Sequence, residues 1–278
     1  MAGWKHRKRD VSTLNTPVTI HGDAGRMGRR LVALAVEDQG LTLAGAVEQK
    51  GHELLGQDAG TIAGLGPQGV ALADVLPDGP SVVIDFTIPA ATRAILDACI
   101  TRRSGIVIGT TGLTDDDHRH IDDAAHTIPV MQAPNMSLGV NLLFALAAQV
   151  ARQLGDDYDI EIVEAHHRFK VDAPSGTALG IAKAICDATG KDMKTDLVHG
   201  RSGSDVPRKR GEIGMHALRT GDVVGRHTAS FGTLGEELQL THIASTRDVF
   251  ARGALRAARW LDGKPAGRYG MKDVLGLE

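Results

Sequence analysis

The chain has 278 residues, of which 42% are hydrophobic, and a formal net charge of −3 at pH 7. This length suits one large domain or two small ones, and the near-neutral charge argues against a general affinity for nucleic acid. Its two cysteines, Cys99 and Cys186, are far apart and in no metal or redox spacing, so we expect a reducing, cytoplasmic compartment.

The start of the chain, "MAGWKHRKRD", is basic, and no apolar stretch of signal-peptide length follows it. We therefore expect residues 1–16 to form a solvated, disordered arm. A transit peptide or a polyanion-binding tail is the minor alternative. Because no apolar run looks long enough to span a membrane, we expect no membrane partner.

The first half of the chain alternates apolar strands with helices. Strands are predicted over 17–22, 41–48, 81–86, 105–112 and 128–135, and helices over 22–40, 89–102 and 114–126. Repeated strand–helix pairs predict an α/β fold with a Rossmann-like, doubly wound parallel sheet. In such sheets ligands bind beyond the carboxyl ends of the strands. Those ends carry "HGDAGRMG", "DFT", "GTTG" and "APNMS", which are small enough for a ligand to approach closely.

The turn "GDAGRMG" follows the first strand and opens the first helix. It departs from the pattern G-x-G-x-x-G, because Ala24 holds the second glycine position or the glycine is displaced to Gly25. Its context is that of a dinucleotide site, since the acid Glu48 ends the next strand. Pyrophosphate would meet free N–H groups at the helix start, with Arg26 nearby. The alternative is a plain turn whose glycines serve tight packing.

The second half predicts a different architecture. Helices are expected over 136–155, 175–190 and 245–263, and strands over 158–167, 211–220, 222–232 and 236–245. Because three of these strands follow one another through short turns, they predict a mixed or antiparallel sheet. This half therefore reads as a second, α+β domain with a mixed sheet. Ser175 is the expected N-cap of the middle helix.

One stretch, "EAHHRFKVDAPSGTA" at 164–178, crowds cations and hydroxyls into a short loop. Lys170, at least one imidazole and the helix start at 175–177 offer donors to an anion. A substrate with one or two carboxylates fits better than a phosphate, because no arginine fork dominates the loop. The alternative is a surface loop whose cations pair with Glu164 and Asp172.

The same stretch resembles the signature of the dihydrodipicolinate reductase family, also called 4-hydroxy-tetrahydrodipicolinate reductases. The blocks "GDAGRMGR", "VVIDFT", "GIVIGTTG", "APNMSLGVN", "GEIGMHALR", "GDVVGRHTASF" and "ASTRDVFARGAL" also resemble this family, in the same order. The resemblance implies a dinucleotide-binding domain over 1–136 and 247–278, and a substrate-binding and oligomerisation domain over 137–246. It also implies NADH or NADPH as cofactor, a small dicarboxylate substrate, a step of lysine and diaminopimelate biosynthesis, and a homotetramer.

The resemblance further assigns roles to individual residues. His166 would be the proton donor and Lys170 the second catalytic residue. The expected substrate-binding residues are His167, Lys170, Ser175, Gly176 and Thr177. The expected cofactor-binding residues are Gly22, Asp23, Ala24, Gly25, Arg26, Met27, Glu48, Gly109, Thr110, Thr111, Ala133, Pro134, Asn135 and Met136. Two departures from the family pattern are the pair Asp23–Ala24 and Gln49, which stands where many members have an arginine for the NADPH 2′-phosphate.

Other classes of protein stay open at this point. A semialdehyde-dehydrogenase-like oxidoreductase would need a nucleophilic cysteine in a loop, whereas Cys99 and Cys186 fall inside predicted helices. A dinucleotide sensor would not need His166 and Lys170. We expect no metal site, because the histidines at 118, 120 and 126 lie on a charge-rich helix that reads as a solvated face.

Overall fold

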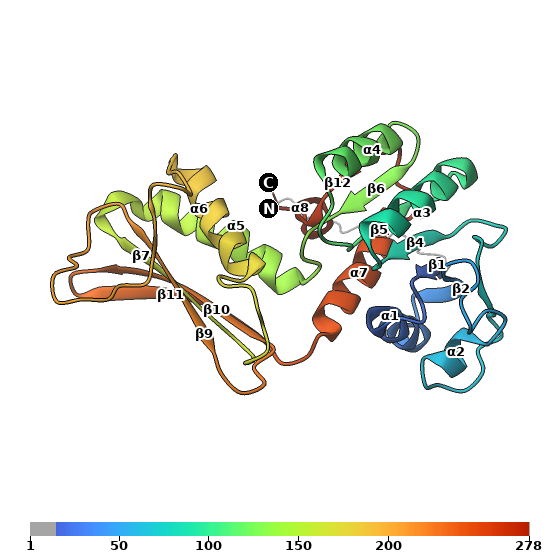
Figure 1. Ribbon diagram of the computed structural model, residues 1–278. Coiled ribbons are helices and arrows are strands. Elements are labelled where there is room, and N and C mark those ends of the chain that lie inside the picture. The colour runs from blue at the N-terminus through green and yellow to red at the C-terminus, as the bar shows by residue number, and fades with distance from the viewer. Residues whose placement is uncertain (1–14, 278) are drawn as a thin grey trace, which may run out of the picture. The chain divides into compact units, whose positions relative to one another are not determined.

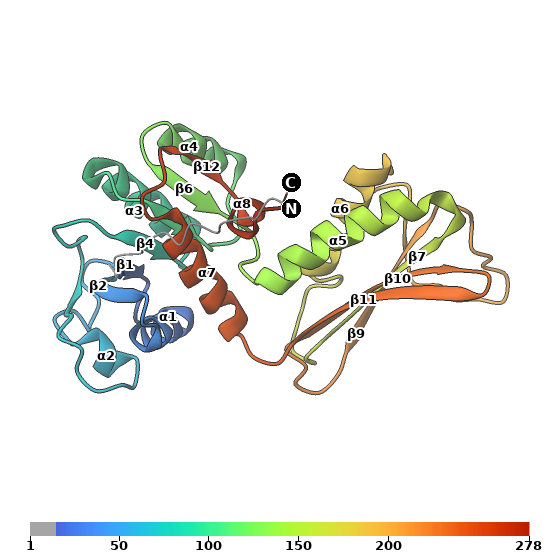
Figure 2. The same ribbon diagram turned by 180° about the vertical axis from the view of Figure 1, so that it is seen from behind.

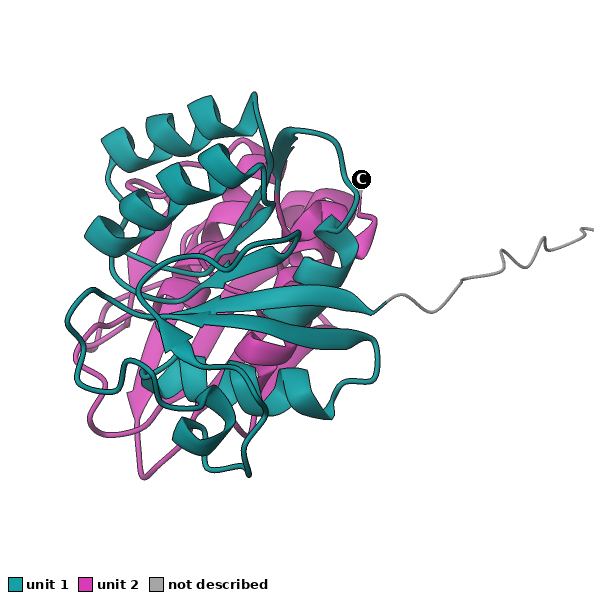
Figure 3. Ribbon diagram, turned by 90° about the vertical axis from the view of Figure 1, so that its right-hand side faces the viewer, with its two compact units in different colours: residues 1–132, 254–269 teal, residues 133–253, 270–278 magenta. Residues whose placement is uncertain are grey.

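The computed structural model describes residues 15–277 and divides into two compact units (Figure 3). Unit 1 runs to Gln132 and resumes over Ala254–Tyr269, and unit 2 comprises Ala133–Gly253 with Gly270–Glu278. The breaks thus differ by a few residues from the domain boundaries expected from the sequence, and the last residues group with unit 2. The expected arm falls almost wholly outside the described residues.

Unit 1 contains a seven-stranded sheet in the order β12-β6-β5-β4-β1-β2-β3, in which all neighbours are parallel. Its strands are β1 (Thr16–His21), β2 (Leu41–Val47), β3 (Leu72–Ala73), β4 (Val82–Asp85), β5 (Ile106–Ile108), β6 (Pro129–Gln132) and β12 (Gly267–Tyr269). The central strands are apolar runs because helices cover both of their faces. The predicted Rossmann-like sheet is therefore confirmed, with the short β3 and β12 as additions.

Helices flank this sheet (Figure 1). They are α1 (Arg26–Glu37), α2 (Ala59–Ile62), α3 (Pro89–Arg102), α4 (Asp115–Ala125) and the part of α7 (Asp248–Leu261) from Ala254 onward. α3 and α4 pack together on one side, and α1 packs against β1 and β2 on the other. α4 begins where the sequence predicts, since Thr114 forms a capping box with Asp117.

Unit 2 contains a five-stranded mixed sheet in the order β11-β10-β7-β9-β8. Its strands are β7 (Asp159–His166), β8 (Leu197–His199), β9 (Ile213–Arg219), β10 (Gly225–Thr233) and β11 (Glu236–Ala244). β10 is antiparallel to both of its neighbours, whereas β7, β9 and β8 run parallel. This mixed sheet confirms the second part of the predicted fold class.

Helices α5 (Leu138–Leu154) and α6 (Gly176–Thr189) pack against each other over one face of this sheet (Figure 2). The core between them combines alternate residues of the strands with the inner faces of the helices, for example Ile162, Phe231, Ala147 and Ile181. A 3-10 turn, η1 (Gly155–Asp157), follows α5, and α8 (Met271–Leu275) packs on α5. As predicted, Ser175 is the N-cap of α6, and its hydroxyl accepts from the Ala178 N–H.

One expectation about α5 is wrong. By length and composition, Leu138–Asp157 is long and apolar enough to cross a membrane. In unit 2 this helix instead buries one face, including Leu143 and Ala147, in the core shared with α6 and the sheet. A helix that packs on a protein core passes the same test, so this feature is weak evidence for a membrane span.

Candidate cofactor and substrate sites

The glycine turn of unit 1 has the geometry of a phosphate-binding loop. Gly22 adopts φ +80°, which favours glycine. A Cβ on Gly28 would lie 2.1 Å from the Gly22 carbonyl oxygen, so only glycine lets α1 pack this close to β1. Gly25 is the N-cap of α1 and has no side chain that could accept from the first N–H groups of the helix. The first N–H groups of the helix are thus available to an anion.

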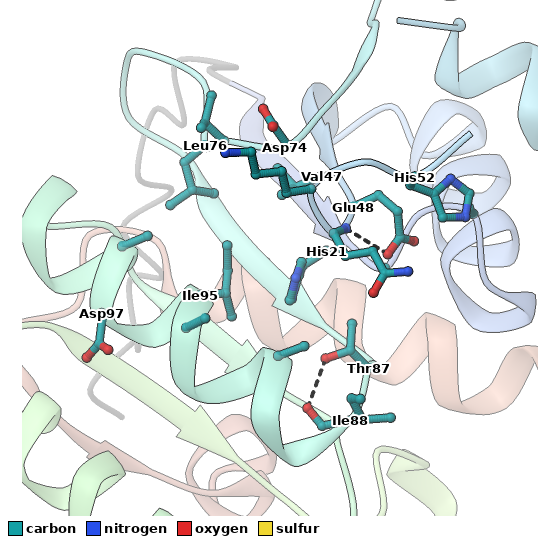
Figure 4. Close-up of a pocket in the computed structure, with 18 of the residues that line it drawn as sticks. His21, Val47, Glu48, His52, Asp74, Leu76, Thr87, Ile88, Ile95 and Asp97 are labelled. Atoms are coloured by element: carbon teal, nitrogen blue, oxygen red, sulfur yellow. Dashed lines mark hydrogen bonds between the residues drawn. The ribbon is translucent and has the colours of Figure 1, made fainter. Parts of the chain in front are cut away.

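This turn borders a cleft of about 1010 Å³ within unit 1 (Figure 4). Gly22, Ala24 and Gly25 line one end, and Glu48, Gln49 and Lys50 follow from the end of β2. Much of the remaining lining is apolar and comes from the loop after β3, from α3 and from the N-cap of α3, including Val75, Leu76, Ile88, Ala91, Ile95 and Ala98. A glycine cradle, an acid after the second strand and an apolar slot suit a dinucleotide.

A buried carboxylate, Asp85, ties together three strand ends beside this cleft. It accepts hydrogen bonds from Thr92 (2.5 Å) and Thr110 (2.8 Å), and its Oδ1 lies 2.7 Å from Nδ1 of His21. Burial raises the pKa of Asp85, but the hydrogen bonds from His21 and Thr92 outweigh it and lower the pKa below its usual value. Neither His21 nor Asp85 belongs to a motif that predicted a role for it, although both end buried strands at the predicted ligand edge.

Asp23, in the same turn, has no such support. Its side chain is fully buried, and neither carboxylate oxygen finds a hydrogen-bond partner within residues 15–277. Burial, and then the negative charge of Glu48, raise the pKa of Asp23 to about 6. The glycine turn therefore holds a buried carboxyl group that binds its proton more tightly than an ordinary aspartate does.

The remaining expected cofactor residues take other positions. Within the described part of unit 1, the lining of the cleft leaves out Asp23, Arg26, Met27 and Gly109–Thr111. Gly109 lies under the Phe86 ring, where a Cβ would meet ring carbons at 2.4 Å. Ala133–Met136 belong to unit 2.

Asn135 in particular lies with a residue expected to bind substrate. Its amide donates to the Thr177 hydroxyl at 3.0 Å. Met136 is buried, and its carbonyl oxygen lies where a Cβ on Gly253 would be. The structure thus joins "APNMS" to the start of α6 within unit 2.

The centre of the site in unit 2 is Glu164, on β7, which is fully buried. Its carboxylate accepts from both terminal nitrogens of Arg219, at 2.9 and 3.0 Å, and from the Ser175 N–H at 3.0 Å. Its Oε2 also lies 2.6 Å from Nδ1 of His166. Burial raises the pKa of Glu164, but the hydrogen bonds from Arg219 and His166 lower it below its usual value. A fixed negative charge therefore stands behind His166.

His166 and a second histidine, His227 on β10, form a pair. Their ring centroids are 5.0 Å apart in an edge-to-face arrangement, and Nε2 of His227 lies 3.1 Å from the Ser175 hydroxyl. Burial lowers the pKa of His227 to about 4, and the neighbouring His166 adds to this. Burial also lowers the pKa of His166, although Glu164 acts in the opposite direction. Burial thus favours the neutral form of both imidazoles in the free protein.

The loop after β7 carries the remaining expected residues. Lys170 is half-buried and pairs with Asp172 at 2.8 Å. Gly176 is exposed, with nothing close to the position of a Cβ, and Thr177 is half-buried. His167 is also half-buried, and its Nδ1 is buried without a partner in the described chain. The structure thus brings the expected catalytic and substrate residues to one end of β7 and α6.

Arg219 and His227 are part of this cluster but had no role in the sequence analysis. They lie 55 residues from Glu164 and 52 residues from Ser175, respectively, so only the pairing of β9 and β10 with β7 brings them in. Both fall inside the blocks "GEIGMHALR" and "GDVVGRHTASF". The Arg219 fork holds Glu164 of the protein itself, and it comes from β9 and not from the loop at 164–178.

The cysteines do not favour the semialdehyde-dehydrogenase alternative. Cys99 lies in α3 and Cys186 in α6, and both are buried. Burial raises the pKa of each thiol. A buried, protonated thiol within a helix is a poor nucleophile.

The chain is similar to known proteins over nearly its whole length. The family model "Dihydrodipicolinate reductase, N-terminus" matches residues 16–136, and "Dihydrodipicolinate reductase, C-terminus" matches residues 139–275. The 4-hydroxy-tetrahydrodipicolinate reductase of Alkalilimnicola ehrlichii is 48% identical over 95% of this chain and all of its own. That of Geobacter metallireducens is 47% identical over 94% of this chain and 98% of its own.

Solved structures show the same fold. Dipicolinate-bound dihydrodipicolinate reductase from Paenisporosarcina sp. TG-14 has a TM-score of 0.72 and 23% identity, over 94% of this chain and 99% of that chain. GenD2 from gentamicin A biosynthesis, solved in complex with NAD, has a TM-score of 0.57 and 15% identity, over 94% and 90%.

The two family models and the relatives named as reductases identify a nicotinamide-dependent oxidoreductase, here built from a Rossmann-like unit and a mixed-sheet unit. Both family models match, and together they cover nearly all of the described residues. The chain belongs to the dihydrodipicolinate reductase family.

Proposed function

We propose that this chain reduces 4-hydroxy-tetrahydrodipicolinate to tetrahydrodipicolinate with NADH or NADPH, a step of lysine and diaminopimelate biosynthesis. The observation that carries this proposal is the buried Glu164–His166 pair at the head of a cationic loop. Relatives that are 47–48% identical over nearly their whole length carry the name of this activity. We further propose that unit 1 binds the cofactor and unit 2 the substrate.

His166 is the proton donor in this proposal. Because Nδ1 of His166 faces the Glu164 carboxylate, the imidazole holds a proton there and leaves Nε2 for the substrate. Burial lowers the pKa of His166 in the free protein. A substrate with two carboxylates adds negative charge beside the ring, which raises that pKa and charges the imidazole when it is needed. The bound nicotinamide supplies the hydride.

Lys170, His167 and the start of α6 hold the substrate carboxylates. Both the hydroxyl and the N–H of Ser175 already have partners within the protein, namely Ala178, His227 and Glu164. The donors left for an anion are therefore the exposed N–H of Gly176 and the N–H and hydroxyl of Thr177. Lys170 has donors beyond the one that Asp172 accepts, and giving up that half-exposed pair would itself cost little.

At the other site, we propose that the N–H groups after Gly25 hold the pyrophosphate and that Glu48 accepts hydrogen bonds from the adenosine ribose. The close packing of Gly28 on Gly22 supports this placement, because any larger residue would close the turn. We also propose that the protein acts in the cytoplasm and as a homotetramer.

A coupled assay tests the activity. Substrate made in place by the preceding synthase is mixed with NADH or NADPH, and oxidation of the cofactor is followed. We expect turnover with the wild-type chain, a loss chiefly of kcat in His166→Gln, and a rise of KM in His167→Gln. Pyridine-2,6-dicarboxylate, the ligand named for the Paenisporosarcina structure, should compete with substrate.

The same assay separates the alternatives. A dinucleotide sensor would bind NADH without oxidising it in the presence of substrate. Turnover that survives both histidine substitutions would place the chemistry elsewhere in the chain.

A further inference from the structure

The Asp23 carboxyl is the least explained charged group of unit 1. It is the second residue of the glycine turn, and its neighbours Gly22 and Ala24 both line the cleft. Its side chain is fully buried, and across residues 15–277 no donor reaches either oxygen. An ionised carboxylate in such surroundings is unfavourable, and it commonly relieves the cost by taking up a proton.

The charges around Asp23 act mostly in the same direction. Glu48 at the end of β2 and Asp58 before α2 are negative, and both raise the pKa of Asp23. Arg29 of α1 lowers it, but its guanidinium is exposed and donates to the Ala24 carbonyl. His21, the other titratable group at this end of β1, is paired with Asp85.

A dinucleotide would add to this imbalance. Its pyrophosphate brings two negative charges to the start of α1, a few residues from Asp23, where no described donor offsets the charge of the buried carboxylate. We propose that Asp23 takes up a proton when the dinucleotide binds, so that this site binds NAD(P)H and a proton together. This inference rests on the proposed placement of the cofactor at the glycine turn.

The sign of the pH dependence follows from linkage. Because protonation is more favourable in the complex than in the free protein, affinity is highest at low pH. It weakens as the pH rises past the value at which free Asp23 ionises, and it levels off where Asp23 of the complex ionises. A neutral residue at position 23 removes this penalty and leaves the affinity independent of pH.

Equilibrium titration with NADH tests the proposal. NADH is the right probe, because the 2′-phosphate of NADPH itself titrates at about pH 6, as phosphate monoesters do. For the wild-type chain we expect Kd to rise roughly tenfold between about pH 6 and about pH 8. Asp23→Asn and Asp23→Ala should vary by no more than about twofold and bind more tightly than wild type at about pH 8. The exposed Glu37, at the far end of α1, gives the matched control: Glu37→Gln should behave as wild type.

Calorimetry in buffers of different ionisation enthalpy counts the protons directly. The wild-type chain should take up a large fraction of one proton per NADH at neutral pH, and Asp23→Asn close to none. If Asp23→Asn or Asp23→Ala folds and keeps the wild-type pH dependence, the inference is overturned, because a group other than Asp23 then takes up the proton.

A separate variant tests the placement itself. Ala24→Glu puts a bulky acid in the cleft beside the turn and should abolish NADH binding. If Ala24→Glu binds NADH as well as wild type does, the cofactor lies elsewhere, and both the placement and the proton uptake are wrong.

Discussion

Two buried carboxyl groups in this chain have pKa values that are shifted in opposite directions. Glu164 in unit 2 and Asp23 in unit 1 are both fully buried. Glu164 is held by the Arg219 fork, the Ser175 N–H and His166, and its pKa lies below the usual value. Asp23 has no donor among the described residues, and its pKa rises to about 6. Burial alone does not determine whether a carboxyl group is ionised. The hydrogen-bond donors around the carboxylate determine it.

This difference in hydrogen-bond donors suits the two carboxyl groups to different roles. A carboxylate with several strong donors stays charged at any physiological pH, so Glu164 can hold His166 in one tautomer throughout a reaction. Asp85, which His21 and three threonines surround, belongs to the same kind. A carboxylate without donors changes its protonation when charge arrives nearby, and Asp23 is of that kind.

The largest effect should come from Glu164→Gln. This change removes the charge that Arg219 and His166 face, and it leaves a half-buried guanidinium without its counter-ion. We expect a loss of about 3 kcal/mol in the free energy of unfolding. Since the tautomer of the proton donor is no longer fixed, kcat should fall about 10²-fold or more. Denaturant unfolding and steady-state kinetics measure the two effects.

Glu161 provides the matched control for Glu164. It also lies on β7, and Arg201, Arg208 and His216 contact it, but it is only half-buried. Glu161→Gln should leave kcat near the wild-type value and cost less stability. Equal losses of kcat in the two variants would mean that Glu164 acts through the fold of the sheet and not through His166.

Lys170→Ala should separate catalysis from stability. The lysine lies on a loop, and its partner Asp172 is exposed, so its removal should change the free energy of unfolding little. Its ammonium stabilises charge that develops on the substrate, and kcat should fall about 10²-fold. Circular dichroism and thermal unfolding check the fold. Near-normal turnover in a folded variant would remove Lys170 from the catalytic machinery.

Much of the fold was predictable because it depends on local patterns. Apolar runs that end in small residues marked the main strands of unit 1, and capping residues such as Thr114 and Ser175 marked helix starts. The strands β3, β8 and β12 were not predicted, because two or three residues are too few to show a periodicity. The expectation that no apolar run could span a membrane also failed at α5. Few charges interrupt the apolar residues of this helix, so its length and composition suffice for a span.

The residues of the candidate sites were predictable from the sequence only where they are close together along the chain. His166, Lys170 and Ser175 share one loop and helix start, so the sequence shows them together. Arg219 and His227 reach the site through strand pairing, which a single sequence does not specify. The isolation of Asp23 was equally hidden, because a buried carboxylate without donors depends on what all neighbouring elements fail to supply.

Asp23→Asn should sharpen the comparison through stability. The folded protein holds the proton of Asp23 more tightly than the unfolded chain does, since the pKa rises from 3.8 to about 6. The ionised form therefore destabilises the fold above about pH 6, by at most about 3 kcal/mol, and this penalty vanishes below about pH 4. Asp23→Asn should gain stability over wild type at about pH 8 and gain nothing at about pH 4. A gain that is the same at both pH values would speak against an ionised Asp23.

The smallest effect concerns the choice between NADH and NADPH. It depends on Glu48, the acid that also acts on Asp23. Glu48 lines the cleft at the end of β2 and repels a 2′-phosphate, and Gln49 brings no charge to offset it. Lys50, exposed at the same rim, is a flexible point charge and weaker than a bidentate arginine. We expect NADH to work at least as well as NADPH. Lys50→Ala should reduce kcat/KM with NADPH about fivefold, the value of roughly 1 kcal/mol for an exposed pair, and leave NADH nearly unchanged. Added salt should weaken NADPH binding more than NADH binding, because it screens this contact. A strong NADPH preference that survives Lys50→Ala would show that another group holds the 2′-phosphate, and that the acids of this cleft do not set the choice.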